Sequence, residues 1–167
     1  MAILDTNGKY YKINLEQSVI ENGLIFSWVT IYASQEERQR EIAQQEEFNA
    51  FIKNIQAKGI DYINLAKNDK LSKEERDNQS FVGYMLVSIA DDVLHARYTT
   101  RKEIVQIPDT IKDIVSECGY KEEWVTNPIK IDGVLRVNCG AYGGEDVTHE
   151  FLYNSLKPSM SKDIQNV

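Results

Sequence analysis

Two histidines lie beside carboxylates in this sequence, and they are the residues best suited to acid–base or metal chemistry. On a helix, Asp91 and His95 would lie one turn apart with Asp92 adjacent, so two carboxylates and an imidazole could hold a divalent ion. A zinc site needs a third or fourth protein ligand, and none is near in the sequence. We therefore interpret His95 as a surface histidine beside acids and predict no metal site.

The second histidine, His149, lies close to Glu145, Asp146 and Glu150, where an acid–base pair is conceivable. Acidic residues also gather at the N-termini of helices, because they interact favourably with the helix dipole. We favour this second interpretation, and we predict no catalytic residue here.

A glycine-rich segment, residues 140–144, has the composition of a phosphate-binding loop. It lacks the Lys and Ser or Thr of such loops, and Glu145 and Asp146 follow it, where they would repel a phosphate. We interpret it as a turn that needs positive φ angles and predict no cofactor. We expect Cys118 and Cys139 to be buried, reduced thiols, although a bridge between them stays open as an alternative.

The composition indicates an acidic globular protein. The chain has 167 residues, a formal net charge of −7, 42% hydrophobic residues and 27% charged residues. Acidic doublets recur while cations are dispersed, and this disfavours nucleic-acid backbones and anionic membranes as partners. The sequence shows neither a signal peptide nor a stretch of bilayer-spanning length. We predict one α+β domain over residues 1–158, a polar tail over 159–167, and a location in the host cytoplasm.

The first 33 residues predict an antiparallel β segment. Asn7-Gly8 and Asn22-Gly23 are strong turn signals between apolar runs. Residues 24–32 are almost wholly apolar, which is typical of a strand buried on both faces, by a core on one side and a partner on the other. We place Trp28 and Tyr32 of this strand in a candidate interface.

A helix should begin at Ser34, which starts a capping box. It should end near Lys58, where Gly59 would supply the C-cap. Its second half carries a predicted core stripe of Phe48, Phe51, Ile52 and Ile55, whereas its first half is polar. We expect this polar half to project into solvent or to rest on another chain, and its candidate interface residues are Glu36, Arg38 and Arg40.

The remaining segments alternate between helix and strand. Ser72 starts a second capping box, and residues 81–100 carry a helical seam, which we prefer over a hairpin with its turn at Asp91-Asp92. We further predict a strand at 104–107, a helix from Pro108 to Cys118, a β-hairpin near residues 129–138 with its turn at Asp132-Gly133, and a helix that Asp146 caps. The fold class is α+β, with several helices packed on the N-terminal β segment.

The opening of the chain resembles a class of small proteins encoded in phages and prophages of Gram-positive bacteria. The matching residues are 5–13 (Asp-Thr-Asn-Gly-Lys-Tyr-Tyr-Lys-Ile) and 29–41 (Val-Thr-Ile-Tyr-Ala-Ser-Gln-Glu-Glu-Arg-Gln-Arg-Glu), in the first quarter of the sequence. Several members of that class are components of the virion neck or tail. The resemblance implies a protein that acts through interfaces, and it assigns no functional residue.

Three hypotheses follow. The first is a non-enzymatic phage or prophage structural or assembly protein of the neck, tail or baseplate region, with a homo-oligomer or other virion subunits as partners and the virion as its final location. The second is an acidic inhibitor that occupies a basic surface of a host protein, for instance by imitating DNA. The third, ranked well below both, is a small hydrolase with a site at Asp91, Asp92 and His95.

Overall fold

The chain forms two compact units, each with its own hydrophobic core. A computed structural model describes residues 2–98, 105–156 and 165–166, and it confirms the α+β class. The first unit comprises Met1–Arg40 and Lys130–Val167, and the second comprises Glu41–Ile129. The sequence predicted one domain over residues 1–158, whereas the buried apolar side chains gather in two separate clusters. Of the predicted tail, only Gln165 and Asn166 lie among the described residues.

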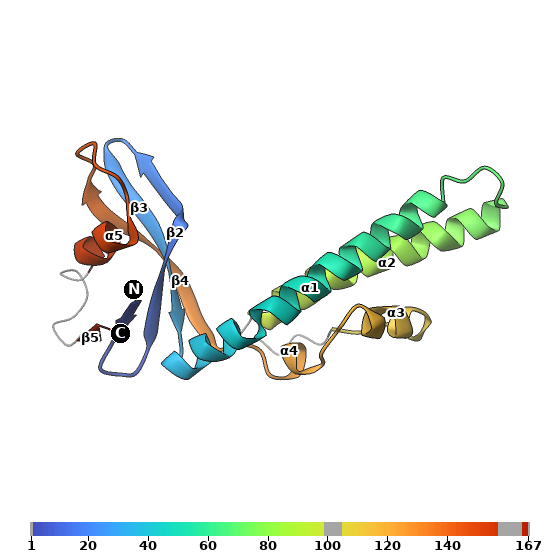
Figure 1. Cartoon of the computed structure of the whole chain (residues 1–167), viewed down its shortest axis with the longest axis horizontal. Helices are drawn as coiled ribbons and strands as arrows, with labels where there is room; N and C mark the ends of the chain where they lie inside the picture. The colour runs from blue at the N-terminus through green and yellow to red at the C-terminus, as the bar shows by residue number, and fades with distance from the viewer. Residues whose placement is uncertain (1, 99–104, 157–164, 167) are drawn as a thin grey trace. The chain divides into compact units, whose positions relative to one another are not determined.

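The first unit is built on an antiparallel sheet, drawn in Figure 1. Its strands are β1 (Ala2–Leu4), β2 (Tyr10–Glu21), β3 (Leu24–Tyr32), β4 (Ile131–Ala141) and β5 (Gln165–Asn166), in the spatial order β4-β3-β2-β1-β5. Both predicted hairpin turns are present. Gly8 has a φ of 80° between β1 and β2, while Asn22 and Gly23 have φ of 52° and 74° between β2 and β3, as a tight hairpin turn requires.

The predicted hairpin at residues 129–138 is wrong, because this segment is part of one continuous strand, β4, paired with β3. The register shifts where Tyr32 faces Ile131 and Ile31 faces Gly133, so Asp132 is an extra residue in a β-bulge. Gly133 does not adopt the positive φ that a type I′ turn would need. Asp132 instead forms an ion pair with Lys9, with 2.9 Å between the Asp132 Oδ2 and the Lys9 Nζ.

The core of the first unit lies between one face of the sheet and helix α5 (His149–Leu156). Ile13, Ile25 and Val29 of the sheet pack with Leu152 and Leu156 of the helix. The predicted cap Asp146 does not begin this helix. The hydroxyl of Thr148 accepts a hydrogen bond from the Phe151 backbone N–H at 3.1 Å, so Thr148 is the capping residue.

Two long helices, side by side in Figure 1, dominate the second unit: α1 (Gln35–Leu65), which begins in the first unit, and α2 (Lys73–Arg97). Ser34 and Ser72 cap them as predicted, through backbone N–H groups three residues later at 3.3 and 3.2 Å. The prediction of a helix rather than a hairpin after Phe81 is confirmed as far as Arg97, and residues 99–100 lie outside the described part.

Gly59 does not end α1, which continues to Leu65. It lies where α1 crosses α2, opposite Gly83. A Cβ atom built on Gly59 would lie 2.9 Å from the Gly83 carbonyl oxygen, and one on Gly83 would lie 2.7 Å from the Gly59 oxygen. The glycine therefore provides close approach between two helices, and not the positive φ of a C-cap.

The core of the second unit confirms the predicted stripe, with Phe48, Phe51 and Ile55 buried and Ile52 half-buried. Three short helices cover it: the 3-10 helix η1 (Asp109–Ile111), α3 (Lys112–Glu117) and α4 (Glu123–Thr126). The strand predicted at 104–107 is wrong for residues 105–107, which form no strand. Val105 and Ile107 instead pack as irregular chain against the helical core.

Candidate interaction surface

The residues that the sequence singled out for acid–base or metal chemistry are not assembled into a site. Asp91, Asp92 and His95 are exposed on α2, and His149 is exposed at the start of α5. Among the described residues, no group of three or more His, Cys, Asp and Glu side chains could hold a metal ion. What these histidines share with their acidic neighbours is a position on a helix surface.

Cys118 and Cys139 are both buried free thiols. They belong to different units, in the cores built on Phe51 and on Val29 respectively. Burial raises the pKa of both thiols. Because the thiolate is the nucleophilic form, a raised pKa disfavours a reactive role for either residue.

The sheet of the first unit has a second face, opposite the face that packs on α5, and apolar side chains are exposed on it. Register places Phe26 of β3 beside Val19 and Asn138, Trp28 beside Asn14 and Arg136, and Thr30 beside Lys12 and Val134. Trp28 is 37% exposed, Val19 41% and Val134 51%. We call this surface the Trp28 face, and it consists of Lys12, Asn14, Val19, Phe26, Trp28, Thr30, Val134, Arg136 and Asn138.

The polar groups of the Trp28 face hold one another in place. The Arg136 guanidinium lies 4.3 Å from the centre of the Phe26 ring and donates a hydrogen bond to Glu21 at 2.6 Å. The Asn14 amide donates to the Thr30 hydroxyl at 3.0 Å. Trp28 lies on the middle strand between these two pairs. An exposed Trp flanked by a positioned Arg is the composition that protein–protein interfaces favour.

Of the predicted interface residues, Trp28 is exposed, but Tyr32 is only 2% exposed and is not available to a partner. Its ring packs edge-on against Tyr10, with centroids 6.1 Å apart, and the Arg38 guanidinium lies 5.6 Å above it. Tyr32 ends β3, and its ring is contacted by Tyr10 of β2 and Arg38 of α1. A strand that is almost wholly apolar does not reveal, from its sequence, which of its ends the rest of the chain covers.

The other three predicted residues lie in the first turns of α1. Glu36 is exposed, and a hydrogen bond with the Ser34 hydroxyl lowers the pKa of its carboxyl. Arg40 donates to the Glu37 carboxylate at 2.5 Å, and that carboxylate also accepts from the Lys130 backbone N–H at 2.9 Å. These contacts fasten α1 to the start of β4 within the first unit, a structural role that the sequence did not predict.

Strand β4 is an edge strand of eleven residues, and it contributes Val134, Arg136 and Asn138 to the Trp28 face. Val134 and Leu135 are consecutive and are 51% and 52% exposed, so both faces of this edge strand carry an exposed apolar side chain. Bulges at Asp132 and Cys139 bound a regular segment, residues 133–138. Native edge strands are commonly protected by charges, Pro or covering elements, and this segment contains a single charge, Arg136.

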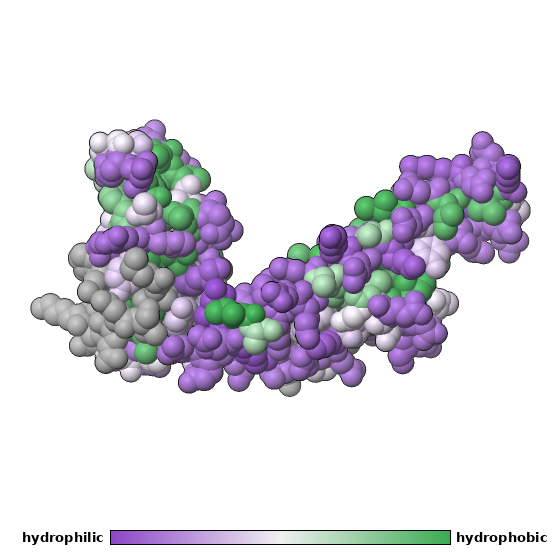
Figure 2. All heavy atoms as spheres, in the orientation of Figure 1, coloured by the Kyte–Doolittle hydropathy of each residue, from purple (hydrophilic) through white to green (hydrophobic). Residues whose placement is uncertain are grey.

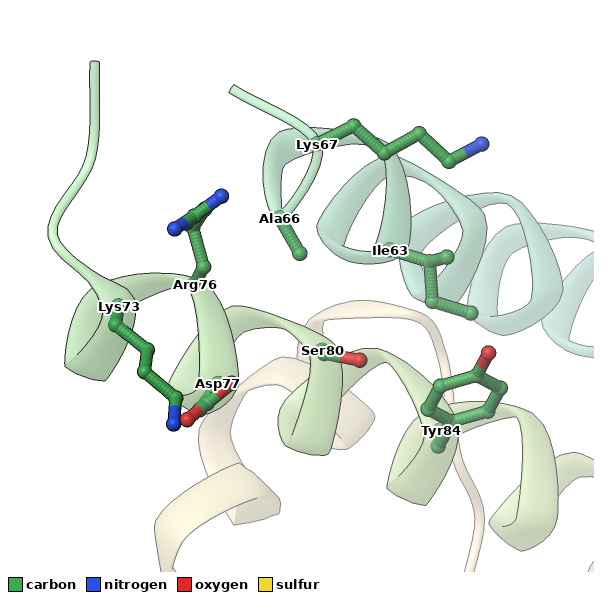
Figure 3. A pocket seen from close by; sticks show the side chains of 8 residues that line it. All are labelled: Ile63, Ala66, Lys67, Lys73, Arg76, Asp77, Ser80 and Tyr84. Atoms are coloured by element: carbon green, nitrogen blue, oxygen red, sulfur yellow. The ribbon is translucent and has the colours of Figure 1, made fainter. Parts of the chain in front are cut away.

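The second unit has a shallow groove of 480 Å³ between the end of α1 and the start of α2, shown in Figure 3. Ile63, Ala66 and Tyr84 contribute its apolar part. Its charged residues are Lys67, Lys73, Arg76 and Asp77, and Ser80 adds a hydroxyl. Arg76 pairs with Asp69 at 3.8 Å. Figure 2 shows apolar surface beside polar surface along these helices; exposed Phe81 and Tyr84 belong to α2.

Arg97 is a buried residue that sequence analysis missed. It is fully buried at the end of α2, and its guanidinium lies 4.1 Å from the Phe48 ring centre and 5.3 Å from that of Tyr98. It also donates to the Glu41 carbonyl oxygen at 3.4 Å. Its position in the last turn of a helix was a possible signal, because cations are favourable there. The contacts give it a structural role in the core.

Comparison of the chain with protein-family models, curated proteins and solved structures gives no match. Among the described residues, no helix combines the length and the apolar character needed to cross a bilayer. The Trp28 face and the β4 edge are the leading candidate interaction surfaces of the described residues.

Proposed function

We propose that this protein is a non-enzymatic structural or assembly component of a phage or prophage virion, and that it acts through protein–protein contacts on its sheet. One observation carries the proposal: Trp28 is exposed at the centre of a sheet face together with Val19 and Val134. Burying such apolar surface against a partner contributes about 25 cal/mol per Å². The resemblance of the opening residues to neck and tail proteins supplies the virion context.

The contact chemistry supports a partner that is itself a protein. A tryptophan supplies a large apolar area, and the flanking Arg136 supplies a cation already oriented by Glu21 and Phe26. Beside Trp28, the buried Asn14 amide donates to the Thr30 hydroxyl, so the polar groups under this surface are already satisfied. A dry centre with a polar margin is the usual anatomy of a specific interface.

A second candidate function is supported by the acidic doublets, since Glu46, Glu47, Asp91, Asp92, Glu122 and Glu123 are all exposed on the second unit. Such a surface suits a basic partner, as the inhibitor hypothesis requires. It ranks below the virion proposal because carboxylates on helix surfaces also serve solubility. A monomer that is absent from particles and binds a basic host protein in a salt-sensitive way would favour this second candidate.

The virion proposal is tested on particles released after induction of the host strain. We expect mass spectrometry of purified particles to detect the chain, and a deletion strain complemented with Trp28→Thr to incorporate it at least about tenfold less than wild type, the loss expected when an interface hot spot is truncated. Ile20→Thr is the matched control, because Ile20 is 49% exposed on β2 but outside the Trp28 face. Complete, infective particles that lack the chain would refute the proposal.

A further inference from the structure

We infer that strand β4 pairs with β4 of a second copy of this chain, antiparallel and about a two-fold axis, so that the two sheets become one continuous sheet. This inference deepens the proposed function and rests on it for its biological role. It concerns the β4 edge, and the part of the Trp28 face that lies on β2 and β3, with Val19 and Trp28, remains exposed on both copies.

The exposure of β4 indicates that a strand is the occupant of this edge. An edge strand presents unpaired N–H and C=O groups along one side, and another strand satisfies them. Val134 and Leu135 point to opposite faces because side chains alternate along a strand, and both are about half exposed. A helix or loop placed over one face would bury only one of them, whereas an added strand contacts both.

The alternation of side chains restricts the register of a self-pairing. A two-fold axis perpendicular to the sheet keeps each face on its own side, so residues directly opposite each other must come from the same face. Leu135 shares its face with Gly133 and Val137, whose partners on β3 are Ile31 and Ser27. The axis must therefore lie where a residue faces its own copy. Within the regular segment 133–138, the two central choices for that residue are Leu135 and Arg136.

Charge decides between these two registers. With the axis at Arg136, two guanidinium groups would face each other directly, and like charges opposite one another destabilise a sheet. With the axis at Leu135, the two Leu135 side chains meet and Arg136 lies opposite Val134 of the second copy. The long stem of Arg136 can then cover that valine while its guanidinium keeps its contact with Glu21 at 2.6 Å.

This register also fits the bulges. It pairs Gly133 with Val137, Val134 with Arg136, and Leu135 with itself, and all five positions lie between the bulges at Asp132 and Cys139. Pairing between the two copies therefore ends where the pairing of β4 with β3 becomes irregular. The self-pairing segment is short and lies wholly between the two bulges. A second copy meets all these conditions without any further partner.

Cysteine cross-linking distinguishes the register residue by residue. In the proposed pairing, the two Cα atoms at position 135 lie about 4.5–5.5 Å apart, within the disulfide range of about 4.4–6.8 Å. The two Cα atoms at position 134 are offset by two residues along the strands, and therefore lie about 8 Å apart, too far to bridge. We expect Leu135→Cys to form a covalent dimer under mild oxidation, and Val134→Cys, which is matched in exposure, to form no disulfide between the two copies.

The native thiols serve as internal controls, because Cys118 and Cys139 are only 8% and 7% exposed, so wild type should not cross-link. A dimer with Val134→Cys but not Leu135→Cys, equal cross-linking of both, or cross-linking of neither would each overturn the inference. Sedimentation velocity gives a second readout: Leu135→Lys should raise the dimer Kd at least about tenfold, whereas Ile20→Lys should leave it unchanged.

Failure of this inference can be told apart from failure of the proposed function. If the chain is present in particles and depends on Trp28, but Leu135→Cys yields no dimer, the proposed function stands and β4 self-pairing is refuted. If Leu135→Cys cross-links as expected but purified particles lack the chain, the pairing stands and the virion role is refuted.

Discussion

Replacement of Gly83 by alanine tests the crossing of α1 and α2, where two opposing effects can be weighed. Alanine is a better helix former than glycine by about 1 kcal/mol, so Gly83→Ala would stabilise an unobstructed helix. Here the new Cβ would lie 2.6 Å from Ile63 Cγ1, 2.7 Å from the Gly59 carbonyl oxygen and 3.0 Å from the Ile63 backbone nitrogen. Two of these three atoms belong to the backbone of α1, so no simple rotamer change relieves the contact.

The size of the penalty follows from the displacement. To bring the Cβ from 2.7 Å to the 3.4 Å of ordinary contact with the Gly59 oxygen, the two backbones must separate by 0.7 Å, since 3.4 − 2.7 = 0.7. Overpacking of a well-packed core typically costs about 1–3 kcal/mol, and a backbone shift belongs at the upper end of that range. After the gain in helix propensity is subtracted, we expect Gly83→Ala to lower the free energy of unfolding by about 1–2 kcal/mol.

The assay is urea unfolding followed by far-UV circular dichroism. Gly59→Ala should cost less than Gly83→Ala, because its Cβ meets only one backbone atom and one side-chain atom, of Val87, below 3.0 Å, both at 2.9 Å. The double variant should cost less than the sum, because a single separation of the helices accommodates both methyl groups. Ser88→Ala, at an exposed position of α2, is the control and should change stability by no more than about 0.5 kcal/mol. A rise of about 1 kcal/mol in Gly83→Ala would refute the close crossing.

Two further predictions concern the core of the second unit and the junction of α1 with β4. Phe51→Ala should lower the free energy of unfolding by about 3–5 kcal/mol, because Phe51 is fully buried against Tyr120 and Trp124, whereas Phe81→Ala at a 64% exposed site should change it by less than about 0.5 kcal/mol. Equal losses in the two variants would contradict the assignment of the core. Burial alone would raise the pKa of Glu37, but the Lys130 N–H and the Arg40 guanidinium outweigh it and hold the pKa below its ordinary value of 4.5. The stabilisation from Glu37 is thus present above pH 4.5 and lost as the pH falls through the folded-state pKa. In acid titrations of stability, Glu37→Gln should therefore lose less than wild type between about pH 5 and pH 3. An unchanged acid slope in that variant would count against the Glu37 contacts.

Local signals in the sequence predicted much of this fold. The Asn-Gly turns at Gly8 and Gly23 and the capping serines Ser34 and Ser72 depend on interactions within a few residues, and all four are present. The stripe from Phe48 to Ile55 depends on helical periodicity alone, and it is buried as predicted apart from the half-buried Ile52. In each of these cases the residue type and its neighbours determine the backbone.

The wrong predictions involve residues whose local preference has more than one tertiary use. Gly59 carries the signal of a C-cap, but the same missing side chain permits the crossing with Gly83, and only the partner helix decides between them. Asp132-Gly133 carries the signal of a hairpin turn. Pairing with the long strand β3 instead keeps this segment extended, and Asp132 becomes the extra residue of a bulge. Tyr32 was predicted to lie in an interface, but Tyr10 and Arg38, which belong to other elements, contact its ring.

The candidate interface was only partly predictable for the same reason. An apolar strand indicates that Trp28 needs a neighbour, but exposure depends on what the remaining chain covers. α5 packs on one face of the sheet and leaves the other, where Trp28 is 37% exposed. The role of β4 could not be foreseen while Asp132-Gly133 was interpreted as a turn, because a hairpin at 129–138 would have divided the edge strand.

The two edges of the sheet differ in a way that bears on how many copies can join. β4 offers eleven residues and a regular segment between its bulges, whereas the outermost strand on the opposite side is β5, a strand of two residues, Gln165–Asn166. A sheet with two long open edges could add copies without limit, as fibrils do. Pairing of β4 with β4 uses the long edge of both copies and leaves outside the opposite edge, which consists of β5, β1 and the part of β2 beyond its pairing with β1, residues 13–21. Because a two-fold contact of this kind is closed, the pairing should stop at a dimer. Larger assemblies would then need a different surface, and the part of the Trp28 face on β2 and β3, with Val19 and Trp28, can supply it.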